Sequence, residues 1–229
     1  MMSLSFAFLA DAEITPLPKF IVFFVVSALA VIVAAAKVDM VIDFSHHSLT
    51  SALIAYCVAS NTPVIVCTTG HTEAEKDCIL QAAQHIPVFF SANMSLGVAL
   101  LCELAKKAAA AFPDADIEIV ETHHNRKLDA PSGTALMIAD AIRTVREKAR
   151  FILGRSGQQK RDKDDIGIHA IRMGNIVGTH EVIIGTDAQT ITLKHEAHDR
   201  AMFAEGALAA AAFLEGKPAG LYNMQCMID

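Results

Sequence analysis

From Val38 onward, short apolar runs alternate with stretches of helical periodicity, and this alternation limits the fold more than any other feature of the chain. Strands that alternate with helices at this spacing form βαβ units around a parallel sheet. The helices are expected at 45–59, capped by Ser45, and at 71–85, capped by Thr72. The strands are expected at 38–44, 63–67 and 87–90. Because such sheets bind ligands at the carboxyl ends of their strands, 67–70 and 91–95 should lie on the ligand-facing edge.

The pattern changes after Arg150. Before that point the predicted elements are two helices and one strand, at 96–112, 135–149 and 117–121. After it, a glycine-rich loop is expected, followed by three runs of alternating residues at 166–172, 181–185 and 189–195. An alanine-rich helix is expected at 201–214. Alternation of apolar and polar residues is typical of antiparallel strands with one covered face. The sequence therefore predicts an α/β region with a parallel sheet, followed by an α+β region with a mixed or antiparallel sheet.

The composition excludes several classes of protein. Of the 229 residues, 53% are hydrophobic and 19% are charged, which excludes a disordered chain and suffices for one large or two small cores. A net charge of −6 without a Lys/Arg cluster argues against a nucleic-acid binder, whose affinity depends on neutralising phosphates. The five cysteines form no CxxC pair, so we expect neither a disulfide framework nor a thiolate metal site. Cysteines without a disulfide framework are typical of proteins in the reducing cytoplasm.

Residues 20–36 form an uncharged run bracketed by Lys19 and Lys37. As a helix at ~1.5 Å per residue the run would cover about 25 Å, the short limit of a bilayer span. Three interpretations compete: a membrane anchor or uncleaved signal, a buried strand followed by an alanine-rich buried helix, and a degenerate remnant of something longer. The basic region and cleavage site of a secretory signal are missing. Because the rest of the chain is typical of a cytoplasmic enzyme, we favour the interpretations without a membrane.

Residues 123–134 carry the densest set of chemical groups, between a predicted strand and a predicted helix. The stretch begins with two imidazoles, a guanidinium and an ammonium, from His123, His124, Arg126 and Lys127. It ends in Ser-Gly-Thr at 132–134, where N–H groups and hydroxyls at a helix N-terminus favour a bound carboxylate. Gly133 would let the ligand approach the backbone closely. Converging cations suit a small dianionic substrate, and a His or Lys among them can deliver a proton to a developing anion.

The same segment has simpler interpretations. Adjacent histidines at a strand end are often only surface polar residues. Neighbouring strand side chains also point to opposite faces, so at most one of the pair should face a given reacting atom. A zinc site is disfavoured, because no third histidine or carboxylate stands nearby at a ligand spacing. The spacing of a phosphate-binding loop is absent. From the residues alone, an anion site and a merely polar surface both stay open.

The run from Glu121 to Ala135, ETHHNRKLDAPSGTA, closely resembles the signature of the 4-hydroxy-tetrahydrodipicolinate reductase family, also called dihydrodipicolinate reductases. The resemblance extends from about Val38 to Asp229. Further matching segments are VIDFS at 41–45, TTG at 68–70, SANMSLGV at 91–98, GRSG at 154–157, IGIHAIRMGNIVGTH at 166–180 and HEAHDR at 195–200. A match of this length and order is highly specific.

The resemblance implies a fold and an activity. The fold would be an incomplete Rossmann-like nucleotide-binding domain, residues 1–94 and 205–229, and a substrate-binding and oligomerisation domain, residues 95–204. The activity would be reduction of 4-hydroxy-tetrahydrodipicolinate to tetrahydrodipicolinate by NADH or NADPH, in lysine and diaminopimelate biosynthesis. The expected partners are a small dicarboxylate substrate and further copies of the chain in a homotetramer. From the residue spacing and the charge we expect no metal site and no nucleic-acid partner, and a membrane is disfavoured.

The resemblance also assigns residues. His123 would be the proton donor or acceptor and Lys127 a second proton donor. The substrate carboxylates would be held by His124, Gly133 and Thr134. The nicotinamide half of the cofactor would be lined by Cys67, Thr68, Thr69, Ser91, Ala92, Asn93 and Met94. These placements agree with the residue chemistry, which puts cations and a helix N-terminus around a dianion and strand ends around a cofactor.

The chain departs from the family near its start. Relatives carry a glycine-rich turn after the first strand that cradles the pyrophosphate, whereas the first glycine here is Gly70. Cys67 replaces a family glycine, and Met94 replaces an aromatic residue. One explanation is that 1–37 are a truncated or out-of-frame start joined to an intact reductase, and we favour it because the substrate motif is complete. The other is a weakened or absent dinucleotide site, which would make the chain a non-catalytic relative that binds a small dicarboxylate.

Overall fold

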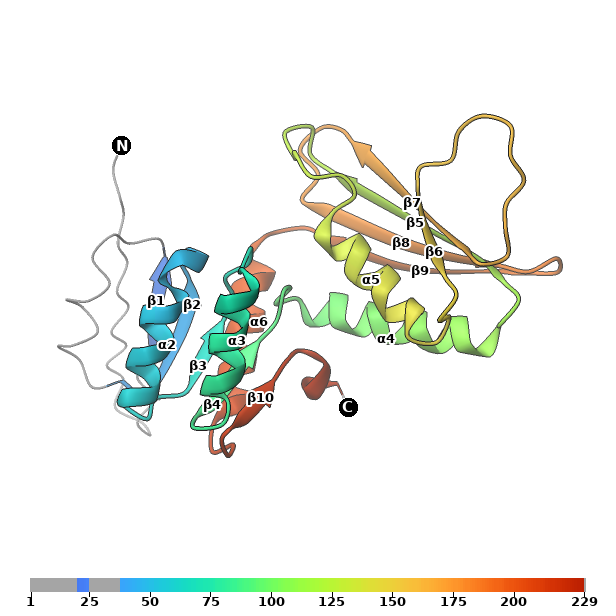
Figure 1. The fold of residues 1–229 in the computed structure, drawn as a ribbon. Coiled ribbons are helices and arrows are strands. Elements are labelled where there is room, and N and C mark those ends of the chain that lie inside the picture. Colours follow the sequence, from blue (N-terminus) through green and yellow to red (C-terminus); the bar gives the residue numbers. More distant parts are fainter. Residues whose placement is uncertain (1–19, 25–37, 229) are drawn as a thin grey trace. The chain divides into compact units, whose positions relative to one another are not determined.

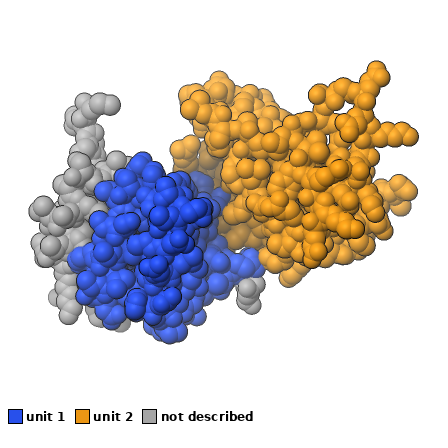
Figure 2. Space-filling model, viewed as in Figure 1, with its two compact units in different colours: residues 1–94, 203–229 blue, residues 95–202 orange. Residues whose placement is uncertain are grey.

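A computed structural model describes residues 20–24 and 38–228 of the chain. The chain divides into two compact units, shown in different colours in Figure 2. Unit 1 comprises Met1–Met94 and Phe203–Asp229, and unit 2 comprises Ser95–Met202.

Unit 1 contains a five-stranded sheet with the order β1-β2-β3-β4-β10, in which every pairing is parallel. The strands are β1 (Phe20–Phe24), β2 (Met40–Phe44), β3 (Val64–Val66), β4 (Pro87–Phe90) and β10 (Gly220–Tyr222). The predicted parallel α/β sheet is therefore confirmed. The sequence patterns did not reveal β10, which comes from the far end of the chain and lies beside β4 (Figure 1).

Helices cover both faces of this sheet. Helices α2 (Thr50–Ala59) and α3 (Glu73–Ala82) lie on one face, and α6 (Ala201–Leu214) lies on the other (Figure 1). The alternation of strand side chains explains the arrangement. Val88 belongs to the core that α2 and α3 share with the sheet, whereas its neighbour Phe89 contacts Phe213 of α6, with ring centroids 6.3 Å apart.

The two helices that follow β2 and β3 begin in different ways. Helix α3 starts at a capping box, in which Thr72 Oγ1 accepts a hydrogen bond from the Glu75 N–H and the Glu75 carboxylate accepts one from the Thr72 N–H. The predicted start of α3 at Thr72 is confirmed. The predicted helix start at Ser45 is wrong: Ser45 donates its N–H to Asp43 Oδ1, and a short 3₁₀ turn at His47–Leu49 precedes α2.

Unit 2 contains a second five-stranded sheet, with the order β6-β7-β5-β8-β9. The strands are β5 (Asp116–His123), β6 (Arg150–Leu153), β7 (Asp165–Arg172), β8 (Gly178–Gly185) and β9 (Thr190–Ala197). The pairings of β7 with β5 and β6 are parallel, whereas those of β8 with β5 and β9 are antiparallel. The predicted mixed sheet is confirmed.

Helices α4 (Leu96–Ala111) and α5 (Gly133–Arg143) share one core with this sheet. Alternating burial along β5 turns every second residue towards them, ending with His123. The prediction that α5 continues to residue 149 is wrong. Beyond Arg143 the chain turns, and the Arg146 guanidinium donates to the carbonyl of Ala109 at the end of α4, at 3.2 Å. The chain then pairs with β7 as β6, which the sequence did not predict.

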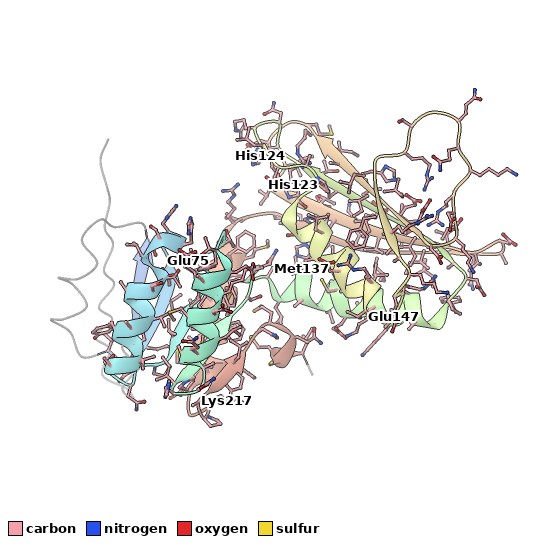
Figure 3. The ribbon with its side chains drawn as sticks, in the orientation of Figure 1. Glu75, His123, His124, Met137, Glu147 and Lys217 are labelled. Atoms are coloured by element: carbon pink, nitrogen blue, oxygen red, sulfur yellow. The ribbon has the colours of Figure 1, made fainter. Side chains whose placement is uncertain are left out.

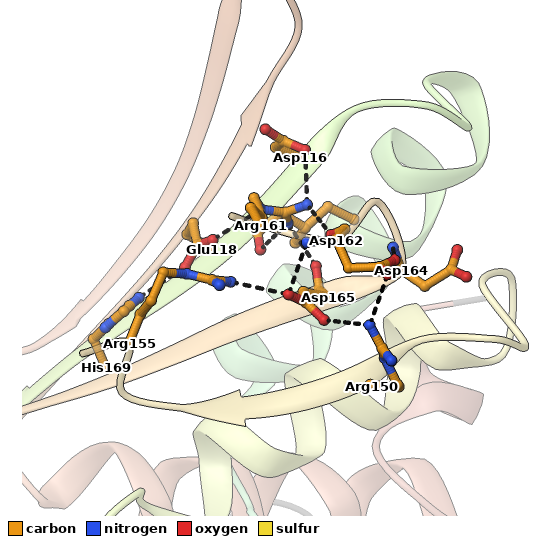
Figure 4. A network of polar contacts seen from close by, with 10 residues as sticks. Asp116, Glu118, Arg150, Arg155, Arg161, Asp162, Asp164, Asp165 and His169 are labelled. Carbon is orange, nitrogen blue, oxygen red and sulfur yellow. Dashed lines mark hydrogen bonds and ion pairs between the residues drawn. The ribbon is translucent and has the colours of Figure 1, made fainter. Parts of the chain in front are cut away.

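The long segment between β6 and β7, residues 154–164, is tied to the sheet by charged side chains (Figure 4). Arg161 lies 2.7 Å from Asp116 Oδ1 and 3.2 Å from Glu118 Oε1, both on β5. Asp165, at the start of β7, accepts hydrogen bonds from Arg150 at 3.0 Å and from Arg155 at 3.2 Å. These contacts hold the segment over the amino-terminal end of β5, at the opposite end of that strand from His123.

The uncharged run at 20–36 is described only in part. Its first five residues form β1 and pair in parallel with β2, which fits the interpretation as a strand. The alanine-rich helix expected after that strand lies outside the described residues. So do the remainder of the supposed membrane segment and, apart from β1, the proposed aberrant start at 1–37. Among the helices that the structure does describe, none has the length and apolar character needed to cross a bilayer.

Candidate active site

The predicted catalytic segment runs without interruption from the end of β5 to the start of α5 in unit 2. His123 is the last residue of β5 and His124 follows it directly, beside the first turn of α5 (Figure 3). The turn at 124–132 then leads to Gly133, the first residue of α5. All five residues predicted to handle substrate therefore come from one strand end, one turn and one helix start.

The His123 ring is fixed on one side and faces a glycine on the other. The side chain is buried, and its Nδ1 lies 2.6 Å from Glu121 Oε2, two residues earlier on the same face of β5. Its Nε2 faces Gly178 at the start of β8, where a Cβ atom would lie only 2.9 Å away. Because glycine has no Cβ, Gly178 leaves room for the Nε2 edge of the His123 ring.

Lys127 and His124 are held together by the turn. The Lys127 N–H donates to the His124 carbonyl at 3.1 Å, and Lys127 Nζ forms an ion pair with Asp129 at 2.8 Å. This contact with Lys127 holds the pKa of Asp129 below its usual value. The pKa of His124 is lowered, first by loss of solvent and then by the Arg126 and Arg200 cations, which favours a neutral imidazole. Its Nδ1 is buried and has no hydrogen-bond partner among the described residues.

The start of α5, where a substrate carboxylate is predicted to bind, is a capped helix N-terminus. Ser132 caps the helix, since its Oγ accepts the Ala135 N–H at 3.2 Å. The N–H groups at the start of a helix lack an acceptor within the helix and carry partial positive charge. Those of Gly133 and Thr134 belong to this first turn. A Cβ atom at Gly133 would meet nothing within 4 Å, so the space in front of this turn is open.

Sequence analysis missed three residues that organise this segment. Glu121 is completely buried and also accepts the Ser132 N–H at 2.9 Å, while both Arg172 Nη atoms lie 2.7 Å from its oxygens. His180 is buried, and its Nε2 lies 3.0 Å from Ser132 Oγ. Burial, followed by the charge of His123, lowers the pKa of His180 to about 4. One signal was present in the sequence: Glu121 is a charged residue at a core-facing position of an alternating strand.

The residues predicted to line the cofactor lie at neighbouring strand ends in unit 1. Residues 67–69 follow β3 and 91–94 follow β4, and because β3 and β4 pair in parallel the two segments share one edge of the sheet. The Cys67 N–H and the Thr68 hydroxyl each donate to Asp43, at 2.9 Å, while Thr69 is exposed. Burial, reinforced by the charge of Asp43, raises the pKa of the Cys67 thiol, which keeps it protonated.

The second segment predicted to line the cofactor, 91–94, is fixed by its own contacts and by α6. Ser91 Oγ donates to the Asn93 carbonyl at 2.8 Å, whereas Ala92 is exposed. Met94 is buried with its carbonyl against Gly206 of α6, where a Cβ atom would lie 1.7 Å from that oxygen.

Ser45, at the end of β2, supplies a test of whether this edge suits a ligand. Its hydroxyl is buried and has no hydrogen-bond partner within the described part of the chain. Together with the backbone and hydroxyl groups that follow β3 and β4, this orphaned group fits a ligand that forms hydrogen bonds, such as a nicotinamide. The turn after β1, where a pyrophosphate would bind, lies outside the described residues. Among residues 38–228, no three His, Cys, Asp or Glu side chains converge as metal ligands.

Comparison with known proteins identifies the family. The sequence model described as "Dihydrodipicolinate reductase, N-terminus" matches residues 13–94, and the one described as "Dihydrodipicolinate reductase, C-terminus" matches residues 97–228. The chain belongs to the dihydrodipicolinate reductase family. The match to the N-terminal model includes β1. The family that the sequence around residues 121–135 indicated is confirmed.

Individual relatives agree with this family. The 4-hydroxy-tetrahydrodipicolinate reductase of Clostridium tetani is 48% identical over 201 residues, which cover 86% of this chain and 78% of the relative. The enzyme of the same name from Brachyspira hyodysenteriae is 44% identical over 190 residues, 82% of each chain. Among solved structures, the dipicolinate-bound dihydrodipicolinate reductase from Paenisporosarcina sp. TG-14 has a TM-score of 0.71 and 26% identity. The match covers 85% of this chain and 75% of that one.

Proposed function

We propose that this chain reduces 4-hydroxy-tetrahydrodipicolinate to tetrahydrodipicolinate with NADH or NADPH, in lysine and diaminopimelate biosynthesis in the cytoplasm. One observation carries the proposal: a single segment of unit 2 combines an imidazole held by a carboxylate, an ammonium group and an open helix N-terminus. Relatives named for this reaction cover most of the chain, and a solved relative binds dipicolinate, a planar dicarboxylate. The two carboxylates of such a ligand would be met by the helix N-terminus and by the cationic side chains of the segment.

In this proposal unit 1 binds the nucleotide. The segments at 67–69 and 91–94 line the nicotinamide, with backbone groups and hydroxyls as hydrogen-bonding partners. A bound nicotinamide supplies the hydride. The neutral Cys67 thiol adds bulk but no charge beside it.

Unit 2 holds the substrate and supplies protons. The first turn of α5, at Gly133 and Thr134, receives one carboxylate, and His124 reaches a carboxylate from the side. Replacing the hydroxyl by hydrogen consumes one hydride and one proton and releases water. His123 delivers the proton from Nε2, because its Nδ1 is engaged by Glu121. Lys127, in the same turn, is the second proton donor.

Turnover and binding measurements test these roles. We expect the chain to oxidise NADH or NADPH when the substrate is supplied, and His123→Ala to lower kcat by ~10²-fold or more, the usual contribution of a positioned acid. Unchanged turnover in that variant would show that the proton comes from another group. Calorimetry with pyridine-2,6-dicarboxylate and with NADH separates the main proposal from its alternative. Binding of the dicarboxylate without the nucleotide would favour a non-catalytic relative.

We also propose a homotetramer built through the sheet of unit 2. Helices α4 and α5 cover one face of that sheet. The opposite face carries half-buried side chains, among them Val120 on β5 and Ile183 on β8. A second copy would complete the burial of this face. The molar mass from light scattering, measured on the samples used for turnover, tests the proposal.

A further inference from the structure

The buried carboxylate of Glu121 has four hydrogen-bond partners. Its hydrogen-bond partners are His123 Nδ1 at 2.6 Å, the two Arg172 Nη atoms at 2.7 Å each and the Ser132 N–H at 2.9 Å. Burial by itself raises the pKa of a carboxyl group, but the hydrogen bonds from Arg172, His123 and Ser132 outweigh it and leave the pKa of Glu121 below its usual value. Glu121 is therefore a negative charge at neutral pH, and the two Arg172 Nη atoms and the Ser132 N–H donate to it.

This ionisation decides which ring nitrogen of His123 carries the hydrogen. An ionised carboxylate only accepts hydrogen bonds, so His123 Nδ1 must donate and hold a proton. The neutral ring is then the Nδ1–H tautomer, and Nε2 is the nitrogen that takes up and releases a proton. That nitrogen lies on the side facing Gly178, away from Glu121.

The same carboxylate also anchors the turn that carries Lys127. On one side Glu121 holds the Ser132 N–H, immediately before the first residue of α5. On the other side Arg172, which forms the two-pronged ion pair with Glu121, also donates from Nη2 to the Asp129 carbonyl at 2.7 Å. The Asp129 side chain in turn pairs with Lys127. The ion pair joins β5 to β7 and holds the second half of the turn, at Asp129 and at Ser132.

We propose that Glu121 is the positioning residue of this site: it fixes His123 as the Nδ1–H tautomer and, with Arg172, sets the turn that presents Lys127 and the start of α5. This inference rests on the proposed function for its catalytic meaning. Its structural content, the control of the His123 tautomer by Glu121, can be tested without turnover.

The test uses Glu121→Gln with Glu118→Gln as the matched control. Glu118 lies on the same strand but on the opposite face, and it also accepts hydrogen bonds from one arginine, Arg161, and one histidine, His169. Both variants lose one carboxylate charge from β5, but only Glu121→Gln touches the site. Light scattering on both variants checks that the oligomeric state is unchanged.

Two quantities are measured. Nitrogen NMR of ¹⁵N-histidine-labelled protein, recorded under conditions in which the His123 ring is neutral, should show the Nδ1–H tautomer in the parent and in Glu118→Gln, and a mixture of tautomers in Glu121→Gln. We expect kcat to fall ~10²-fold in Glu121→Gln and to change less than about threefold in Glu118→Gln. The Kd for pyridine-2,6-dicarboxylate should rise about tenfold in Glu121→Gln, because the Ser132 N–H loses a charged acceptor.

Removing the charge of Glu121 leaves the half-buried Arg172 without the carboxylate that it pairs with, so Glu121→Asp provides a second variant that keeps the charge. Its carboxylate is withdrawn by one methylene, about 1.5 Å, and should no longer hold His123 Nδ1. A folded Gln or Asp variant in which His123 stays entirely in the Nδ1–H tautomer, with kcat unchanged, would overturn the inference. Failure of the proposed function looks different: the parent would show the expected tautomer and bind the dicarboxylate, but would oxidise neither nucleotide.

Discussion

The substitution Gly133→Ala separates substrate binding from folding more cleanly than any other change in this site. Gly133 is the first residue of α5, and its φ is not in the left-handed region, so the backbone conformation suits alanine. The new Cβ would meet nothing within 4 Å. Alanine also favours helix over glycine, by up to about 1 kcal/mol in a helix interior. The free energy of unfolding should therefore stay unchanged or rise by a few tenths of a kcal/mol, up to about 1 kcal/mol.

The effect on binding should be the opposite. If a substrate carboxylate accepts hydrogen bonds from the first N–H groups of α5, the added methyl group occupies the space through which the carboxylate approaches. Loss of one or two charge-assisted hydrogen bonds corresponds to ~1.5–3 kcal/mol. The Kd for pyridine-2,6-dicarboxylate should accordingly rise about 10–100-fold, and KM for the substrate should rise with it.

The assay pairs calorimetry with urea unfolding, and Gly97→Ala supplies the contrast. Gly97 occupies the corresponding first turn of α4, but there a Cβ atom would lie 2.8 Å from Cδ2 of His195. We therefore expect Gly97→Ala to lose about 1–3 kcal/mol of unfolding free energy, the usual effect of overpacking. A Gly133→Ala protein that binds the dicarboxylate as tightly as the parent would refute the placement of a carboxylate at α5.

Two further predictions concern the buried histidines. Gly178→Ala should lower kcat at least tenfold, because its Cβ would lie 2.9 Å from His123 Nε2 and displace the ring that Glu121 holds. Steady-state kinetics would measure the fall in kcat, and circular dichroism would check that the fold is kept. His180 should make folding sensitive to acid: the unfolded chain takes up its proton near pH 6.5, but burial, followed by the charge of His123, holds the folded pKa at about 4. The unfolded state thus gains a proton first as the pH falls, and stability is lost between pH 6.5 and 4, by roughly 3 kcal/mol at most. Urea unfolding at several pH values should show a flatter profile in His180→Gln, and an unchanged slope would contradict this origin.

The family, the two sheet types and the catalytic segment could be predicted from local patterns. The period-two alternation of β5 makes its last residue, His123, a residue of the helix-facing side. The Thr72 capping signal identified the start of α3. The order of histidines, lysine and Ser-Gly-Thr between a strand and a helix pointed to an anion site at a helix start as one of the two interpretations that the residues left open. Such features depend on residues a few positions apart, so periodicity and residue type are enough to reveal them.

Other features arise only from the tertiary fold, because they join residues that are distant in sequence. β10 completes the first sheet by pairing with β4, and β6 forms where the local pattern favours a longer helix, because β7 supplies a partner strand. The pairing of Arg172 with Glu121, and the placement of Gly178 against His123, depend on the register of β5 with its neighbours β7 and β8. The sequence determined which groups this protein has for chemistry. The fold decided which nitrogen of His123 is available, because the pairing of β5 with β7 brings Arg172 to Glu121 and keeps the carboxylate beside His123 Nδ1 ionised.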